Sequence, residues 1–247
     1  MHTQQLSDRL KSLTRLGQSG AGELLNSFLK RGCAVCDRPA SSPISKSFCL
    51  DCHRQLQQQI MQETPSKAAP AAAPFSITAV GAYDGTLKRA ILALKYENRP
   101  DVAHFLGTAL AQVWKTTQQQ AKPLYALPIP LHKDRQRQRG YNQAALLARA
   151  FCQTNGIALI ETGLVRSQAT IPQHQLNLEA RQQNLANVFE VDRSLAKRQK
   201  KLKQRGQSLK VVIVDDIYTT GATVQSAIGV LSRAGVAVVG VATVAKT

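Results

Sequence analysis

The sequence predicts an α/β fold with a largely parallel sheet and flanking helices, preceded by a small cysteine-containing module. From Phe75 onward, apolar stretches typical of strands alternate with stretches typical of helices, the order that produces βαβ units. Residues 211–214 are apolar at every position, as expected of a parallel strand buried on both faces. With 247 residues and 43% hydrophobic side chains, the chain is long enough for one such domain and a smaller module.

The elements of the main domain follow from the spacing of apolar residues. Leu87, Ile91 and Leu94 recur at intervals that place them on one face of a helix. In chain order we expect a strand with its turn at 77–85, helices at 86–98 and about 101–118, an extended run at 125–132, a basic loop, a helix at 143–153, a buried strand at 210–216, a helix after Gly221 and a strand at 236–244. About forty residues between the two βαβ units are rich in Gln, Asn, Arg and Lys, which indicates a lid, an insertion or a disordered segment.

Four regions make up the predicted domain organisation. Residues 1–30 carry leucines at helical spacing and are expected to form a helical segment. Residues 31–56 hold four cysteines, and residues 64–74 form an Ala/Pro-rich linker with no pattern that could bury a face. Residues 75–247 form the main domain.

The charge of the chain indicates its class of partner. Thirty-two Lys and Arg against 15 Asp and Glu give a formal net charge of +17, which favours polyanions such as nucleic acid or nucleotides. The sequence shows neither an apolar run long enough to span a membrane nor the apolar centre of a signal peptide, so we predict a cytoplasmic protein. In that reducing compartment, paired cysteines bind metal more often than they form disulfides.

The four N-terminal cysteines have the spacing of a zinc site. Two CxxC pairs are separated by twelve residues, so four thiolates can reach the corners of a tetrahedron around one structural Zn²⁺ ion. So small a module lacks the core to fold alone, and metal binding should supply its folding free energy. The alternative is two buried or redox-active pairs. The predicted ligands are Cys33, Cys36, Cys49 and Cys52, whereas Cys152 reads as a core residue.

Two adjacent carboxylates and a Thr/Gly-rich turn follow the buried strand at 211–214. Ligands of open α/β sheets bind at the carboxyl ends of the strands. There, carboxylates can accept hydrogen bonds from ribose hydroxyls, while the turn and the following helix N-terminus suit a phosphate. The alternative is an ordinary helix N-cap after a strand. The candidate ribose and phosphate ligands are Asp215, Asp216, Thr219, Thr220, Gly221, Ala222 and Thr223, with the two aspartates as candidates for catalysis.

A basic stretch follows the earlier predicted strand, at the same edge of the sheet. Arginine offers paired donors to phosphate oxygens, so this stretch suits a pyrophosphate group. By itself it would be read as a solvated loop, but its pairing with the acidic strand end favours binding. The candidates are His132, Lys133, Arg135, Arg137 and Arg139.

Two later segments each leave two alternatives open. Residues 166–191 either fold over the site as a lid or are a loop pinned by its own polar side chains. Residues 193–205 carry seven Lys or Arg and no acid, and either follow nucleic-acid phosphates or form a disordered basic insertion, the latter being favoured. The lid candidates for ligand contact are Arg166, Thr170, Gln173, Arg181 and Asn184.

Residues 211–223, VVIVDDIYTTGAT, resemble the phosphoribosyl pyrophosphate-binding signature of type I phosphoribosyltransferases. Together with the cysteine pairs, Lys95-Tyr96, the stretch 128–143 and the R-x3-T-x2-Q-x2-L spacing from Arg166, this signature resembles the ComF/GntX family over almost the whole chain. The resemblance implies a phosphoribosyltransferase-like domain, a role in handling incoming single-stranded DNA during natural transformation, and other competence proteins as partners. It also implies that the ribose and 5-phosphate lie on residues 215–223, with Mg²⁺ bridging hydroxyls and pyrophosphate.

Three functions remain open at this point. The first is a competence factor that binds a ribose phosphate and engages single-stranded DNA through its positive charge. The second is an active phosphoribosyltransferase in base or nucleotide salvage, in which basic groups stabilise pyrophosphate leaving an oxocarbenium-like centre. The third is a zinc-dependent adaptor whose α/β domain has become a scaffold. The first is preferred, and the sequence names neither an acceptor base nor an oligomeric state.

Overall fold

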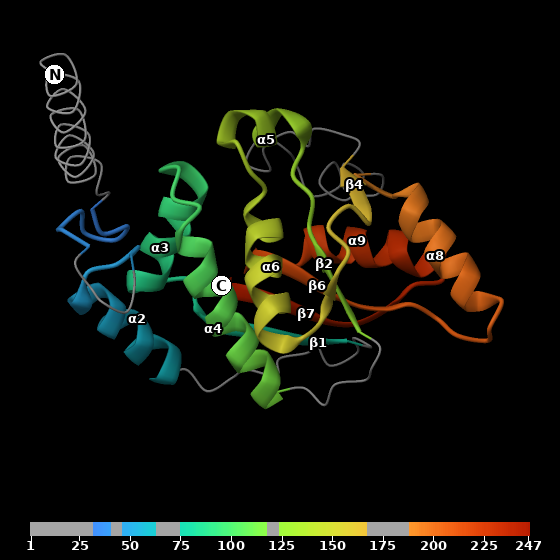
Figure 1. Ribbon diagram of the computed structural model, residues 1–247, viewed down its shortest axis with the longest axis horizontal. Helices are drawn as coiled ribbons and strands as arrows, with labels where there is room; N and C mark the ends of the chain where they lie inside the picture. The colour runs from blue at the N-terminus through green and yellow to red at the C-terminus, as the bar shows by residue number, and fades with distance from the viewer. Residues whose placement is uncertain (1–31, 41–45, 63–74, 118–123, 167–187) are drawn as a thin grey trace, which may run out of the picture.

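The protein is described by a computed structural model that covers residues 32–40, 46–62, 75–117, 124–166 and 188–247. Its centre is a parallel five-stranded sheet with the strand order β1-β7-β6-β2-β3 (Figure 1). The strands are β1 (Ser76–Ala82), β2 (Tyr125–Pro128), β3 (Ala158–Leu159), β6 (Lys210–Tyr218) and β7 (Ala237–Lys246). The predicted α/β class with a parallel sheet is therefore confirmed.

Helices cover both faces of this sheet, as the apolar run in β6 predicts. Val212 and Val214 pack into the core beneath α3 (Gly85–Tyr96), α4 (Val102–Thr117) and α6 (Gln143–Asn155). Val211 and Ile213 point the other way, into the core beneath α8 (Arg193–Lys203) and α9 (Ala222–Arg233). All four side chains are fully buried, since successive residues of a strand face opposite sides. Cys152 lies in the first core, as predicted.

Two segments predicted as irregular are helical. The basic stretch after β2 contains α5 (Lys133–Arg139), which begins where the His132 ring accepts a hydrogen bond from the Asp134 N–H and ends at Gly140 in the left-handed conformation. The insertion at 193–205 contains α8, capped by Asp192 and anchored by buried Leu195. The prediction of a disordered insertion is therefore wrong, because Leu195 and Gln199 give the basic helix a buried face.

A short antiparallel pair, β4 (Leu164–Arg166) and β5 (Phe189–Val191), lies beside the main sheet. The segment between these strands, which includes the lid candidates Thr170, Gln173, Arg181 and Asn184, lies outside the described residues, as does the predicted helical segment 1–30. Within the described part of the chain, none of the helices has the length and apolar character needed to cross a membrane.

The cysteine module packs directly on the main domain. Its helix α2 (Leu50–Gln62) lies against α3, and the Gln59 side chain donates a 2.7 Å hydrogen bond to the Asp84 carboxylate. Phe48 meets Phe105 of α4 edge to face, with ring centroids 5.3 Å apart. The module and the main domain therefore share one hydrophobic core.

The side chain of Arg99 connects the cysteine module to the main domain. Its guanidinium is buried and makes two hydrogen bonds, of 3.0 and 2.9 Å, to the Asp101 carboxylate. The same group donates to the Gly32 carbonyl at 2.7 Å and to the Ser47 carbonyl at 3.3 Å, on both segments that carry cysteines. One buried cation therefore satisfies backbone groups of the module from the main domain.

Candidate functional site

The two adjacent aspartates lie within β6, beyond the point where its neighbour β2 ends. The last pair between β2 and β6 joins Pro128 to Val214, so from Asp215 onward β6 has no partner on that side. On the other side β6 continues alongside β7 as far as Tyr218. The strand therefore runs further than the sequence predicted. Its two aspartates lie at the carboxyl end of the sheet, where the shorter β2 no longer pairs with β6.

Both aspartates are buried, with exposed fractions of 8% for the whole residue Asp215 and 4% for the whole residue Asp216. The Asp215 Oδ1 atom accepts a 2.8 Å hydrogen bond from the backbone N–H of Asp216. Burial, together with the neighbouring Asp216 charge, raises the pKa of Asp215 well above its ordinary value. The stabilising contribution of this carboxyl group is fully present below its unfolded-state pKa and is lost as the pH rises through the folded-state pKa, so a charged Asp215 costs stability unless a ligand compensates.

Lys95, in the last turn of α3, provides the opposite charge. Its Nζ lies 3.0 Å from Asp216 Oδ2, and both side chains are mostly buried. The contact is an ion pair without an aligned hydrogen bond, so among the described residues Asp216 Oδ2 accepts none. Lys95 is part of the family resemblance but is not among the predicted site residues, because no local pattern links it to a strand 120 positions later.

The turn after β6 is narrow in this structure. Gly221 has a φ of +76°, and α9 begins at the next residue. The Tyr218 ring lies over Gly221, so the hollow bordered by Asp215, the turn and the start of α9 has a volume of only about 20 Å³. That volume holds about one water molecule, so a phosphate group requires Tyr218 to move. Thr219 and Thr220 are exposed at its rim.

Gly221→Ala is expected to lower the free energy of unfolding by about 1–3 kcal/mol, because an alanine is strained at this φ and its Cβ would collide with Tyr218. Gly229→Ala, in the same helix, is the matched control. Its Cβ would meet nothing closer than 3.6 Å, and alanine should stabilise the helix by about 0.5–1 kcal/mol. Urea unfolding measures the change in the free energy of unfolding for each variant. A change in the same direction for both would contradict the prediction that alanine is strained at position 221.

A large basic cleft opens next to Lys95. Its volume is about 670 Å³, and its lining brings together residues from the end of α3 and from α5 with the glycine that follows it. The Arg139 guanidinium lies 5.6 Å from the centre of the Tyr96 ring and donates to the Gln143 side chain. The lining residues are Lys95, Tyr96, Asn98, Arg135, Arg137, Gln138, Arg139 and Gly140.

Not every predicted basic residue lines this cleft. His132 caps α5 through its ring, and Lys133 borders a shallower hollow of about 410 Å³ together with Arg137. Asn142 caps α6 by accepting from the Ala144 N–H at 3.0 Å and donates to the Ile129 carbonyl at 3.0 Å, which fixes the end of β2 relative to α6. The motif around Asn142 therefore has a structural role that the sequence did not reveal.

Arg166 is the one lid candidate that the structure describes. Its guanidinium lies 5.7 Å from the centre of the Phe189 ring. Burial and the neighbouring Arg135 lower the pKa of Arg166, and the Asp215 carboxylate opposes this shift. Arg166 thus belongs to the same electrostatic neighbourhood as the aspartate pair and α5.

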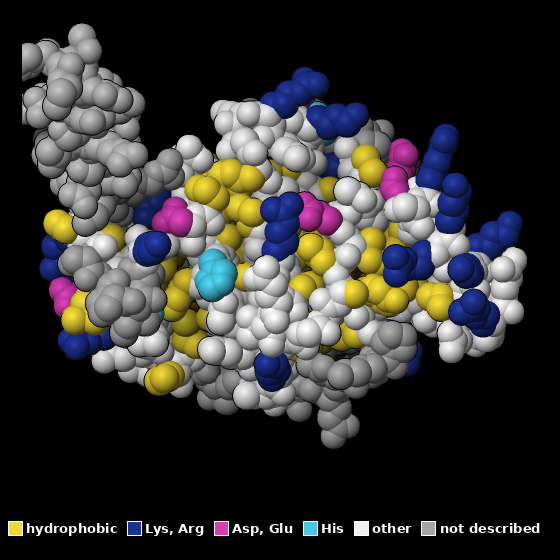
Figure 2. All heavy atoms as spheres, viewed as in Figure 1, with side chains coloured by type: hydrophobic (Ala, Val, Ile, Leu, Met, Phe, Trp, Pro, Cys, Tyr) yellow, Lys and Arg dark blue, Asp and Glu magenta, His cyan; other side chains and the backbone are white. Residues whose placement is uncertain are grey.

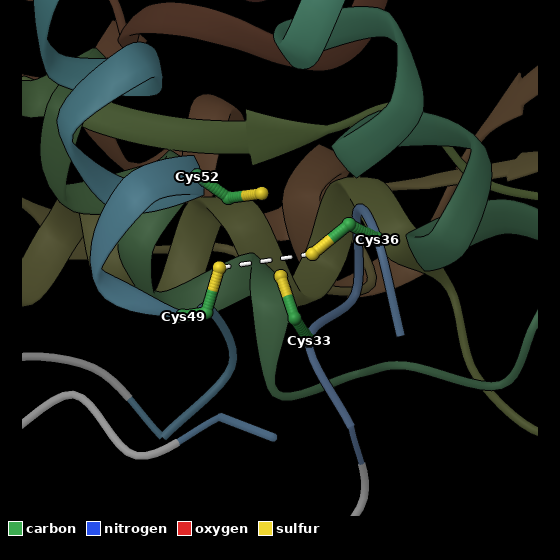
Figure 3. Close-up of side chains that lie close together, drawn as sticks. All are labelled: Cys33, Cys36, Cys49 and Cys52. Carbon is green, nitrogen blue, oxygen red and sulfur yellow. Dashed lines mark hydrogen bonds between the residues drawn. The ribbon is translucent and has the colours of Figure 1, made fainter. Parts of the chain in front are cut away.

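The four predicted cysteine ligands converge on one point (Figure 3). Their Sγ atoms all lie within 4.8 Å of one another, and Cys36 Sγ lies 3.7 Å from Cys49 Sγ. A tetrahedral site with metal–sulfur bonds of 2.3 Å places sulfurs about 3.8 Å apart, so the donor set and spacing fit a metal ion. None of the described cysteines forms a disulfide.

Arg38 stabilises negative charge on this cluster. Its side chain donates to Cys36 Sγ at 3.4 Å and also pairs with Asp51 at 3.1 Å. The hydrogen bond from Arg38 is the main cause that lowers the pKa of Cys36 to about 6. Burial, by contrast, raises the pKa of Cys52. A positively charged neighbour therefore favours the thiolate form that a metal requires.

Comparison with known proteins identifies the family. A model of the phosphoribosyl transferase domain matches residues 138–247, which contain β6 and its turn. Over 218 residues, the chain is 30% identical to DNA utilization protein YhgH of Salmonella typhi, covering 87% of this chain and 84% of that protein. This chain belongs to the ComF/GntX family. Among other ComF/GntX relatives, competence protein F of Haemophilus influenzae is 32% identical over 161 residues, covering 64% of this chain and 66% of that protein.

A more distant ComF/GntX relative is competence protein ComFC of Bacillus subtilis, which is 22% identical over 207 residues, covering 82% of this chain and 72% of that protein. The family resemblance drawn from the sequence is therefore confirmed, together with its phosphoribosyltransferase domain. The domain match begins inside α5 and takes in Arg139 and the aspartate pair, whereas Lys95 and the cysteine cluster lie before it.

Proposed function

We propose that this ComF/GntX protein binds phosphoribosyl pyrophosphate, or a related ribose phosphate, and acts on single-stranded DNA in the cytoplasm during natural transformation. The proposal rests on the buried pair of aspartates at the carboxyl end of β6, next to a cleft lined by Lys95 and three arginines. Carboxylates beside a basic cleft suit a ligand with vicinal hydroxyls at one end and phosphates at the other.

Each part of the ligand has a candidate partner in this arrangement. Asp215 and Asp216 would accept hydrogen bonds from the ribose hydroxyls, since Asp216 Oδ2 accepts none from the described residues. The turn 219–223 and the α9 N-terminus would bind the 5-phosphate once Tyr218 moves. Arg135, Arg137 and Arg139 would bind the pyrophosphate, and Mg²⁺ would supply further neutralising charge there.

The DNA part of the proposal rests on the relatives and on charge. Two of the relatives are named as competence proteins and others as DNA utilization proteins. A net charge of +17 provides the field that attracts a polyanion. Competence proteins that handle the same DNA are the expected protein partners.

We also propose that the cysteine cluster holds a structural zinc ion. All four ligands are cysteines, which is typical of a closed structural zinc site with no position left for a substrate. The module packs against α3 and α4, so zinc would stabilise the helix that carries Lys95 and would not contact the ligand.

A second candidate function is transfer of the ribose phosphate to a base in salvage. The cleft of about 670 Å³ is large enough for a second substrate beside the ribose phosphate. Arginine side chains in that cleft would stabilise the departing pyrophosphate. Release of pyrophosphate in the presence of a panel of free bases distinguishes this activity from binding alone.

The ribose-phosphate site is tested by calorimetric titration of phosphoribosyl pyrophosphate with Mg²⁺ into wild type and the Asp215→Asn/Asp216→Asn variant. We expect binding by the wild type and a loss of at least about a hundredfold in the variant, because two acceptors for ribose hydroxyls become amides and each lost charge-assisted hydrogen bond costs about 1.5–3 kcal/mol. The substitutions keep side-chain volume, and thermal unfolding checks that the variant remains folded.

Glu161→Ala/Glu190→Ala is the control, since it removes two exposed acids from other parts of the chain. It should bind like the wild type. If the wild type shows no heat of binding at millimolar ligand, the ribose-phosphate site is absent. If the aspartate variant binds as tightly as the control does, the ligand lies elsewhere.

A further inference from the structure

A second basic surface lies at the other end of the sheet from the aspartate pair. The helix α8 and the turn after it carry seven Lys or Arg between residues 193 and 205, all of them exposed. Figure 2 shows Lys and Arg gathered over the part of the molecule where Figure 1 places α8. Among the described residues none of these seven side chains forms an ion pair, so the surface retains its charge; the nearby acids are Asp192, which caps α8, and Glu190 on β5.

The helix presents this charge in a fixed arrangement. Leu195 and Gln199 are buried, and the Gln199 side chain donates to the Gly235 carbonyl at 2.6 Å and accepts from the Leu209 N–H at 2.8 Å. These bonds fix the rotation of α8 on the main domain. Arg193, Lys197 and Lys201 therefore follow one another at intervals of about 6 Å along the solvent face.

A cavity opens at the C-terminal end of α8, where Leu202 lines it. Its volume is about 350 Å³, near the lower end of the range for small-molecule pockets, about 300–1,000 Å³. The ring of Tyr125, at the start of β2, lines it, and the Arg198 guanidinium lies 5.2 Å from the centre of that ring. The remaining lining residues are Leu202, Gly206, Gln207, Ser208, Leu209 and Lys210.

This surface is separate from the proposed ribose-phosphate site. Tyr125 and Lys210 begin β2 and β6, whereas Asp215 lies five residues further along β6. At 3.3 Å per residue, the two sites are about 16 Å apart along the strand. Neither site shares a lining residue with the other.

We propose that α8 and the adjacent Tyr125 cavity form the surface that binds single-stranded DNA, with backbone phosphates along the Arg193–Lys197–Lys201 row and an unpaired base in the cavity. The inference rests on the proposed DNA-handling function and names the surface that performs it. A base stacked on an aromatic ring next to arginine is a common arrangement in proteins that bind single strands. A duplex has no unpaired base to offer, so single strands should bind more tightly.

An anionic membrane would also be attracted by the charge, but the apolar residues of α8 do not suit it. Leu195 is buried and Leu202 faces the cavity, so no leucine of the helix projects outward into a bilayer. Peripheral helices that bind membranes expose apolar side chains opposite their charges. Nucleic acid is therefore the better match.

The test is fluorescence anisotropy with a labelled oligothymidine of twenty nucleotides, at several salt concentrations. For Lys197→Glu/Lys201→Glu we expect affinity at least about tenfold lower and a salt dependence less steep by about 1.4 in log–log slope, because two phosphate contacts are lost. For Tyr125→Leu we expect affinity at least about fivefold lower with an unchanged slope, because stacking involves no counterion release.

The matched control is Arg54→Glu/Lys88→Glu, which makes the same change of net charge at exposed positions of α2 and α3. If this control loses as much affinity as the α8 variant, binding follows net charge and the assigned surface is wrong. The assignment is equally wrong if a duplex binds as tightly as the single strand, or if anionic phosphatidylserine vesicles bind the wild type in preference to DNA.

The same experiment separates failure of this surface from failure of the proposed function. If the wild type binds no DNA, the DNA-handling function itself fails. If the wild type binds and the α8 variant binds equally well, only the surface assignment fails. Calorimetry with phosphoribosyl pyrophosphate should give the same affinity for the α8 variant as for wild type, because the two sites lie at opposite ends of the sheet.

Discussion

Replacing Cys49 with serine is expected to release the metal ion and to unfold the cysteine module, which then no longer packs on the main domain. A hydroxyl is a poor ligand for zinc, and three remaining thiolates leave the site open. Zinc contributes about 10–16 kcal/mol to the folding of isolated zinc-finger peptides. The packing of so small a module cannot replace a free energy of that size. The measurements are metal content, expected to fall from about one ion per chain to near zero, and amide hydrogen exchange in α2, expected to accelerate.

Cys152→Ser provides the matched control. Cys152 is buried in α6, away from the cluster, so this change removes a thiol without removing a ligand. It should lower stability modestly and leave metal content and exchange in α2 unchanged. If Cys49→Ser retains a full equivalent of metal, or loses metal while α2 stays protected, the cluster does not hold the module together.

The consequences should reach the main domain through Arg99. Its guanidinium bonds to the Gly32 and Ser47 carbonyls, and these bonds depend on the module being folded. Without them, Asp101 would be the one remaining partner of this buried cation among the described residues. We therefore expect the loss of metal to weaken the region around α4 as well, which would make the module a structural part of the protein and not an independent adaptor.

The sequence predicted those features that depend on local spacing. The four cysteines were found because two CxxC pairs bring their own ligands together. The buried strand at 211–214 was found because an apolar run without alternation requires cover on both faces, and the structure supplies it from α6 and α9.

Features that depend on distant parts of the chain were missed. The strand β6 continues two residues beyond its predicted end at 216, because it pairs with β7 as far as Tyr218, and the length of that pairing could not be predicted from one sequence. The Tyr218 ring fills the turn that was predicted to bind a phosphate. The helix α8 was readable, since Leu195, Gln199 and Leu202 have helical spacing, but its charge dominated the interpretation.

Lys95→Met should destabilise the protein by about 3 kcal/mol, the lower end of the range for breaking a buried ion pair, because Lys95 itself is 17% exposed. The substitution leaves the Asp216 carboxylate 6% exposed and without its counter-charge, next to Asp215. Taking an unpaired charge out of water is the costly step. Urea unfolding at neutral pH measures the change, and Lys88→Met on the exposed face of the same helix should cost less than about 1 kcal/mol.

The double variant Lys95→Met/Asp216→Asn decides the cause. If the cost arises from an uncompensated carboxylate, the second substitution removes that charge and should recover most of the lost stability. If the two changes simply add, Lys95 acts through packing, and the ion pair has no energetic role. Recovery of stability without recovery of ligand affinity would show that the buried acidic pair serves ligand binding at a cost in stability. In the free protein, Lys95 from the neighbouring helix offsets that cost.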